Sequence, residues 1–172
     1  MKKLFLFVTA LAFTLTGCED NESPSTIMTS EITVDDVSFK PSRTGLLTYF
    51  MEGTDGVQDV RHLNLIKTNG NIITQGIYIN LDLKEGRTNE GGSYIFHIGE
   101  TATNLFANGI YVEGEMSYGI AGGTVHVTEM TDGYYKLIFE DVEARDVFNP
   151  SNNRMINGEF KGKFKVVNPT IE

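Results

Sequence analysis

The chain has 172 residues, of which 40% are hydrophobic, 14 are basic and 23 are acidic, and its formal net charge is −9. Nucleic acids and anionic lipid surfaces are bound through clustered lysine and arginine, so this excess of acid excludes both as electrostatic partners. The length suits one domain with a hydrophobic core and is short for two. A single cysteine excludes a disulfide within one chain.

The first 17 residues have the pattern of a secretory signal peptide. Lys2 and Lys3 form a short positive segment, and an apolar run from Leu4 to Leu15 follows it. That run is too short for a transmembrane helix, which needs roughly 20 apolar residues. Removal of residues 1–17 leaves 155 residues with 12 basic and 23 acidic side chains, a net charge of −11.

The leader ends in Leu15-Thr16-Gly17-Cys18, which resembles the lipobox of bacterial lipoproteins. The resemblance implies that the Cys18 thiol is diacylated, that the chain is cut just before it and that the new amino group is acylated too. Two acyl chains already anchor a protein stably, so three make attachment to the membrane effectively permanent. The alternative is a free or buried cysteine that follows a signal peptide. A lipidated Cys18 is not available for thiol catalysis.

Residues 18–30 are predicted to form a flexible acidic tether. After Cys18 the chain is acidic and then rich in serine, with a proline and almost no apolar side chain to bury. Acidic residues directly after the lipidated cysteine resemble the surface-export signal of Bacteroidota lipoproteins. This resemblance implies the outer face of the outer membrane rather than the periplasmic side. An ordinary solvated linker is the alternative.

From Glu31 onward the apolar residues recur with a period of two, which is typical of β-strands. Tight turns are indicated at Asn69-Gly70-Asn71 and Asp132-Gly133, and a further turn is predicted at Gly122-Gly123. Gly158 and Gly162 lie within the last strand and predict a bend or a close backbone approach. The predicted strands are 32–39, 46–51, 57–68, 72–84, 93–98, 110–118, 124–130, 135–139 and 154–167.

These elements predict an all-β fold, an antiparallel meander of about nine strands that forms a flattened barrel or a two-sheet sandwich. Residues 31–168 are expected to form the single β domain, with 169–172 as a C-terminal tail. The segments 122–129, 134–139 and 157–164, together with 32–39, resemble small Bacteroidota surface lipoproteins with one β domain. That resemblance implies a fold and a location, and no activity.

The sequence predicts no metal site, no cofactor and no catalytic residue. His62, His97 and His126 lie on three different predicted strands, without a paired-histidine motif. A Gly-x-Ser-x-Gly elbow is also absent from the sequence. The carboxylate pairs Glu113/Glu115 and Asp141/Glu143 are interpreted as solvated charge rather than as a glycosidase pair. The chain is therefore not expected to be an enzyme, with a hydrolase as the third alternative.

Tyr78, Tyr111 and Tyr134 are predicted to be exposed, and they are the candidate ligand-binding residues. Tyrosine on a sheet face can stack on a sugar ring and hydrogen-bond its hydroxyls, although cross-strand aromatics also stabilise sheets. The chain is expected to be a ligand-binding or accessory module for a glycan or a small apolar molecule. An open apolar interior would favour the apolar ligand, and a flat tyrosine-lined face the glycan. The alternative is a structural subunit that packs on another envelope protein.

Overall fold

The computed structural model describes residues 28–53, 56–83, 91–96, 105–130, 133–146, 148–149 and 151–167. Several predictions fall outside these ranges and stay predictions. They concern the leader, Cys18, most of the tether, His97 and the tail 169–172. Every regular element in the described ranges is a β-strand, and none of these residues forms a helix able to cross a membrane.

The twelve strands belong to one sheet. Their bounds are β1 (Thr29–Ser30), β2 (Thr33–Val34), β3 (Val37–Ser38), β4 (Arg43–Gly53), β5 (Gly56–Asn69), β6 (Ile72–Leu83), β7 (Gly92–Phe96), β8 (Leu105–Glu113), β9 (Met116–Glu129), β10 (Tyr134–Asp146), β11 (Asn153–Lys163) and β12 (Lys165–Val167).

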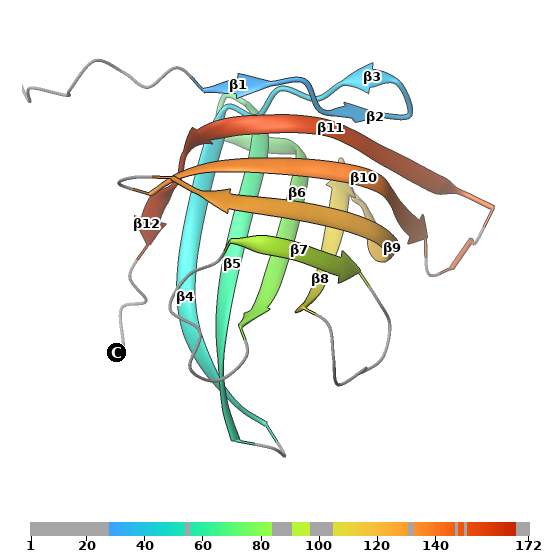
Figure 1. Ribbon diagram of the computed structural model, residues 1–172. Helices are drawn as coiled ribbons and strands as arrows, with labels where there is room; N and C mark the ends of the chain where they lie inside the picture. Colours follow the sequence, from blue (N-terminus) through green and yellow to red (C-terminus); the bar gives the residue numbers. More distant parts are fainter. Residues whose placement is uncertain are drawn as a thin grey trace, which may run out of the picture.

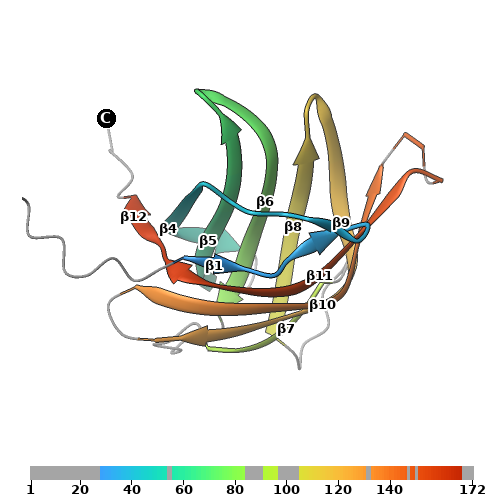
Figure 2. The ribbon, with the colours of Figure 1, turned by 90° about the horizontal axis from the view of Figure 1, so that it is seen from above.

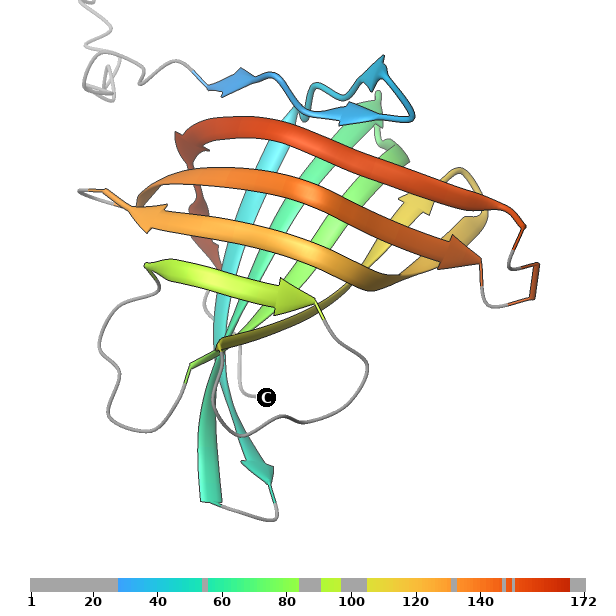
Figure 3. The ribbon, with the colours of Figure 1, turned by 45° about the vertical axis from the view of Figure 1, so that its right-hand side comes forward.

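Antiparallel neighbours run from β4 through β5, β6, β8, β9 and β10 to β11, as expected for a meander. The strand β7 fills the gap where β8 and β9 diverge, parallel to β8 and antiparallel to β9. The sheet curls strongly into a half-barrel (Figure 1). In Figure 3, β9, β10 and β11 cross in front of β4, β5 and β6. The all-β prediction is confirmed, and the two layers belong to one curled sheet.

The two ends of the meander meet at a short parallel ladder. Only Phe164 separates β11 from β12, and β12 pairs with β4 in parallel. A meander with an odd number of strands brings its first and last strands parallel, which explains the direction of this pairing. The predicted single strand 154–167 is thus two strands, β11 paired with β10, β2 and β1, and β12 paired with β4.

The curl is concentrated where three neighbouring strands bend. The register of β10 shifts against β9 and β11 around Asp141, which has a positive φ of 49°. Gly123 on β9 and Gly158 on β11 have φ values of 94° and 110° at the same level. The predicted turn at Gly122-Gly123 is therefore wrong, because β9 continues through it as one bent strand. Bulges increase local twist and re-aim a strand, so the glycines serve the curvature.

The predicted first strand, 32–39, is in fact a hairpin. Asp35 and Asp36 both have positive φ, as a two-residue hairpin turn requires, and they reverse the chain between β2 and β3. The backbone N–H of Asp35 donates to the carbonyl of Met155, which docks this hairpin on β11. Ile32, Val34 and Phe39 are buried and extend the core beyond the sheet.

The concave face of the sheet is filled by large side chains. The alternation predicted for β6 is confirmed, since Ile77, Ile79, Leu81 and Leu83 are all fully buried. Phe160 and Phe164 also face inward, as predicted. The largest fully buried side chains are Tyr94, Tyr111, Tyr118, Tyr135, Phe39, Phe96, Phe139, Phe160 and Phe164.

Candidate functional site

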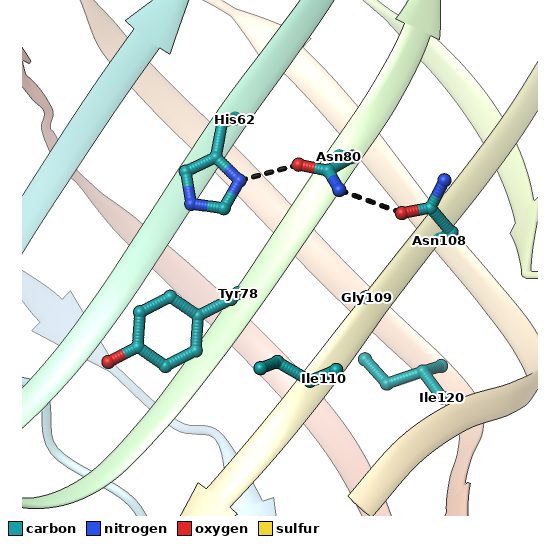
Figure 4. A pocket seen from close by; sticks show the side chains of 7 residues that line it. All are labelled: His62, Tyr78, Asn80, Asn108, Gly109, Ile110 and Ile120. Atoms are coloured by element: carbon teal, nitrogen blue, oxygen red, sulfur yellow. Dashed lines mark hydrogen bonds between the residues drawn. The ribbon is translucent and has the colours of Figure 1, made fainter.

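An open pocket of about 390 Å³ lies on the convex face of the sheet, over β5, β6, β8 and β9 (Figure 4). Leu63 on β5 and Ile79 on β6 point into the core, so the strand alternation turns their neighbours His62, Tyr78 and Asn80 outward. The lining residues are His62, Tyr78, Asn80, Asn108, Gly109, Ile110 and Ile120. No charged side chain is among them.

A row of three polar side chains forms one edge of the pocket. His62 lies opposite Asn80 on the neighbouring strand, and Asn80 lies opposite Asn108 on the next. Nδ1 of His62 is hydrogen-bonded to Oδ1 of Asn80. Nδ2 of Asn80 donates to Oδ1 of Asn108 over 2.8 Å. The row is held on three paired strands, so its geometry is set by the sheet and not by a loop.

Two rings lie flat beside this row. Figure 4 shows the His62 and Tyr78 rings face-on from outside the sheet. Their centroids are 6.3 Å apart and their planes are inclined by 24°. The Tyr78 ring covers Gly76, since a Cβ on this glycine would lie 2.5 Å from Cε2 of the ring. The bare backbone of Gly76 lets the ring lie down, with one face on the sheet and the other turned outward. Partial burial raises the pKa of Tyr78 above its ordinary value.

The remaining wall of the pocket is apolar. Ile110 pairs with Tyr78 across β8 and β6 and is 44% exposed. Ile120 on β9 also lines the pocket, but it is buried and belongs to the core. Gly109 lies between Asn108 and Ile110 where the strands approach closely. A Cβ on Gly109 would lie 2.4 Å from the carbonyl oxygen of Tyr78, so only glycine fits there. The pocket therefore offers an uncharged surface of flat rings, amides and aliphatic carbon.

Of the three predicted tyrosines, only Tyr78 lines this pocket. Tyr134 is half-buried on β10, which β8, β7 and β9 separate from β6 in the sheet. The prediction that Tyr111 is exposed is wrong, because the side chain is fully buried in the core. His62, Asn80 and Asn108 were not predicted as ligand-binding residues. Alternation placed His62 and Asn80 on outward positions of predicted strands, whereas Asn108 precedes the predicted strand 110–118 and lies on β8 in the structure.

Tyr111 belongs to a polar cluster at one rim of the sheet instead. Its hydroxyl accepts a hydrogen bond of 2.8 Å from Nε2 of Gln75, and its ring lies 5.8 Å from that of Tyr118. Arg154 is placed over the Tyr118 ring and pairs with Glu113 over 3.0 Å. Burial and, less strongly, the Glu113 carboxylate raise the pKa of Tyr111 to about 12. The hydrogen bonds of this cluster satisfy the polar ends of buried aromatics, which is a structural role.

A hydrogen-bonded serine, histidine and glutamate lie on the opposite layer. Oγ of Ser93 on β7 is 2.6 Å from Nδ1 of His126 on β9, and Nε2 of His126 is 2.9 Å from the Glu140 carboxylate on β10. Sequence reasoning did not find this row, because its members come from three strands. All three side chains lie on the outer sheet face, and Ser93 and Glu140 are exposed. A serine hydrolase also needs hydrogen-bond donors for the oxyanion and a cleft for the substrate, and a flat sheet face offers no cleft. These three residues are therefore interpreted as a cross-strand polar row and not as a catalytic triad.

Among the described residues, no group of three histidine, cysteine or acidic side chains is placed to hold a metal ion. The chain matches no family model, no curated protein and no solved structure.

Proposed function

We propose that this chain is a lipid-anchored envelope protein whose β domain binds a neutral glycan at the convex-face pocket. The observation that carries the proposal is the combination of two flat rings with a row of amide side chains in an uncharged pocket.

Saccharides match this combination in two ways. The C–H face of a pyranose ring packs on an aromatic ring, and Tyr78 presents one free ring face outward. Hydroxyl groups need paired donors and acceptors at fixed positions, and the His62–Asn80–Asn108 row supplies both. The acidic surface of the chain disfavours charged anionic glycans, which leaves neutral ones.

The alternative of a small apolar ligand in the interior has less support. The interior positions are occupied by tyrosine, phenylalanine and leucine side chains, many of them fully buried. An apolar ligand would have to displace such packing, which costs free energy in a close-packed core.

Location and anchoring in this proposal rest on the leader. Lipidation of Cys18 and display at the outer membrane follow from the resemblance of residues 15–18 to a lipobox and of the acidic tether to an export signal. A glycan-binding domain tethered in this way would hold a polysaccharide at the cell surface without transforming it.

A glycan array tests the proposal. The chain from residue 18 onward, carrying Cys18→Ser, is applied to neutral and charged glycans beside a Tyr78→Ala variant. Binding of a neutral glycan that the variant loses supports the proposal. Failure to bind any glycan on the array contradicts it.

A second candidate function, packing on another envelope protein, is favoured by apolar residues on neighbouring turns. The tips of the β5–β6 and β8–β9 hairpins and the end of β10 lie along one side of the molecule (Figure 2). Ile72 at the β5–β6 turn is 72% exposed, Met116 at the β8–β9 turn 44%, and Phe148 just after β10 97%. Exposed apolar patches often mark protein contacts. A photo-crosslinking residue at position 148 should capture one discrete envelope protein in cells, and a blank result contradicts this function.

A further inference from the structure

The hydrogen-bonded row in the pocket has a direction. Nδ2 of Asn80 donates to Asn108, so Oδ1 of Asn80 is the atom that faces His62. A carbonyl oxygen only accepts, and Nδ1 of His62 must therefore carry the proton. In the neutral imidazole the other nitrogen, Nε2, is then an acceptor. At the opposite end, the amide nitrogen of Asn108 is a donor.

Both ends of the row are open to a ligand. None of the described residues takes a hydrogen bond from Nδ2 of Asn108 or donates one to Nε2 of His62. Asn108 is exposed and His62 half-buried. Three strands separated by about 4.8 Å place the ends about 10 Å apart. A ligand that satisfies both ends must donate a hydrogen bond at His62 and accept one at Asn108.

The donor end of the row, at Asn108, adjoins aliphatic carbon. Ile110 lies two residues after Asn108 on the same face of β8, and Ile120 lines the same pocket. The glycine between Asn108 and Ile110 contributes no side chain to the space between them. A ligand group that fits here carries a carbonyl oxygen and a methyl group together. An acetamido group has both.

The charge of the pocket favours the acetylated form of an amino sugar over the free amine. A free hexosamine carries an ammonium group, and the lining residues include no carboxylate to pair with it. Burial of an unpaired charge is costly, whereas the acetamido group is neutral.

Resting on the proposed function, we infer that the glycan contains an N-acetylhexosamine. Its acetamido carbonyl accepts from Nδ2 of Asn108, and its methyl group packs on the exposed side chain of Ile110. A sugar ring of the same glycan lies on Tyr78, and a hydroxyl donates to Nε2 of His62.

Calorimetry with two matched trisaccharides tests this inference on the full chain in detergent. The probes are the β-1,4-linked trimers of N-acetylglucosamine and of glucose, which share linkage and ring configuration. We expect the acetylated trimer to bind about tenfold more tightly, since an unmade hydrogen bond and a lost methyl contact each weaken binding. Equal binding of both trimers overturns the inference and leaves the proposed function standing. Binding of neither overturns the inference, and the glycan array decides separately on the proposed function.

A variant at the donor end sharpens the test. Asn108→Asp replaces the donor amide by an acceptor of the same shape at an exposed position, so the preference for the acetylated trimer should fall to within about twofold. Asn71→Asp, on the exposed β5–β6 turn, adds the same charge and is the matched control. A preference that survives Asn108→Asp contradicts the inference.

The direction of the row can be read without any ligand. The chain has three histidines, and ¹⁵N spectra of their imidazoles separate the two neutral tautomers. The signal lost in His62→Gln identifies His62. We expect the His62 tautomer that is protonated at Nδ1. A ring protonated at Nε2 alone would mean that the hydrogen bonds of the row run in the opposite direction, and this result overturns the inference.

Discussion

Replacing Gly123 by alanine should destabilise the domain far more than the same change at the adjacent Gly122. Gly123 has a φ of 94°, and a Cβ there would lie 2.4 Å from the carbonyl oxygen of Asp141 on the neighbouring strand. At Gly122 an added Cβ meets nothing within 4 Å. The pair therefore separates the effect of the bend from that of adding one methyl group.

The size of the effect follows from two costs. A left-handed backbone conformation costs a non-glycine residue about 1–2 kcal/mol. Relief of the steric overlap requires β10 to move at its bulge, and overpacking of this kind costs about 1–3 kcal/mol. Together they amount to about 2–5 kcal/mol, a large part of the roughly 5–15 kcal/mol that stabilises a typical domain.

Urea denaturation measures the difference. The chain has no tryptophan and seven tyrosines, so tyrosine fluorescence and circular dichroism are the suitable probes. Gly122→Ala should stay within about 1 kcal/mol of the parent chain. Equal stability of the two variants would refute the assignment of the bend to Gly123 and Asp141.

Three further predictions concern titration, reactivity and anchoring. The pKa of Tyr111 is raised to about 12 in the folded chain, so its neutral form stabilises the fold fully below pH 10 and the free energy of unfolding should fall between pH 10 and 12. Tyr111→Phe should flatten that decline, and an unchanged dependence of stability on pH would contradict the assignment. Ser93 should not be labelled by a fluorophosphonate probe, since it lies on a flat strand face, and labelling that His126→Ala abolishes would make the row catalytic. Cys18→Ala should release the protein from membranes into the soluble fraction, and continued membrane attachment would overturn the lipobox interpretation.

Most of the strands could be predicted because alternation of apolar and polar residues is a local property. Ile77, Ile79 and Leu81 face the core, as their spacing indicates. Alternation did not show that the chain continues as one bent strand in β9 but reverses as a hairpin between β2 and β3. Glycine pairs and aspartate pairs both tolerate positive φ, and only the neighbouring strands determine whether the chain bends or reverses there.

The orientation of Tyr111 was predicted wrongly because both faces of β8 carry apolar residues. Ile110 and Val112 alternate with Tyr111, so the spacing does not decide which side is buried. The structure buries the tyrosine because Gln75, on the neighbouring strand, satisfies its hydroxyl at the rim. That hydrogen bond depends on strand pairing, which the sequence pattern does not contain.

The pocket itself depends on one bulge. At the Asn69–Ile72 turn the strands pair in one register, and an extra residue, Thr74, shifts the pairing by one position before His62 is reached. Without that shift His62 would lie opposite Ile79 instead of Asn80, and the polar row would not form. The outward faces could be predicted from the sequence, but the partners across the strands could not.

The central claim is that the convex-face pocket binds a neutral glycan, and isothermal titration of a glycan selected from the array tests it most directly. Tyr78→Ala should weaken binding about fivefold or more, since stacking on a single aromatic side chain contributes on the order of 1 kcal/mol or more. Tyr134→Ala, on the other layer of the sheet, should leave the affinity unchanged. Equal affinities of the parent chain and Tyr78→Ala would contradict the account.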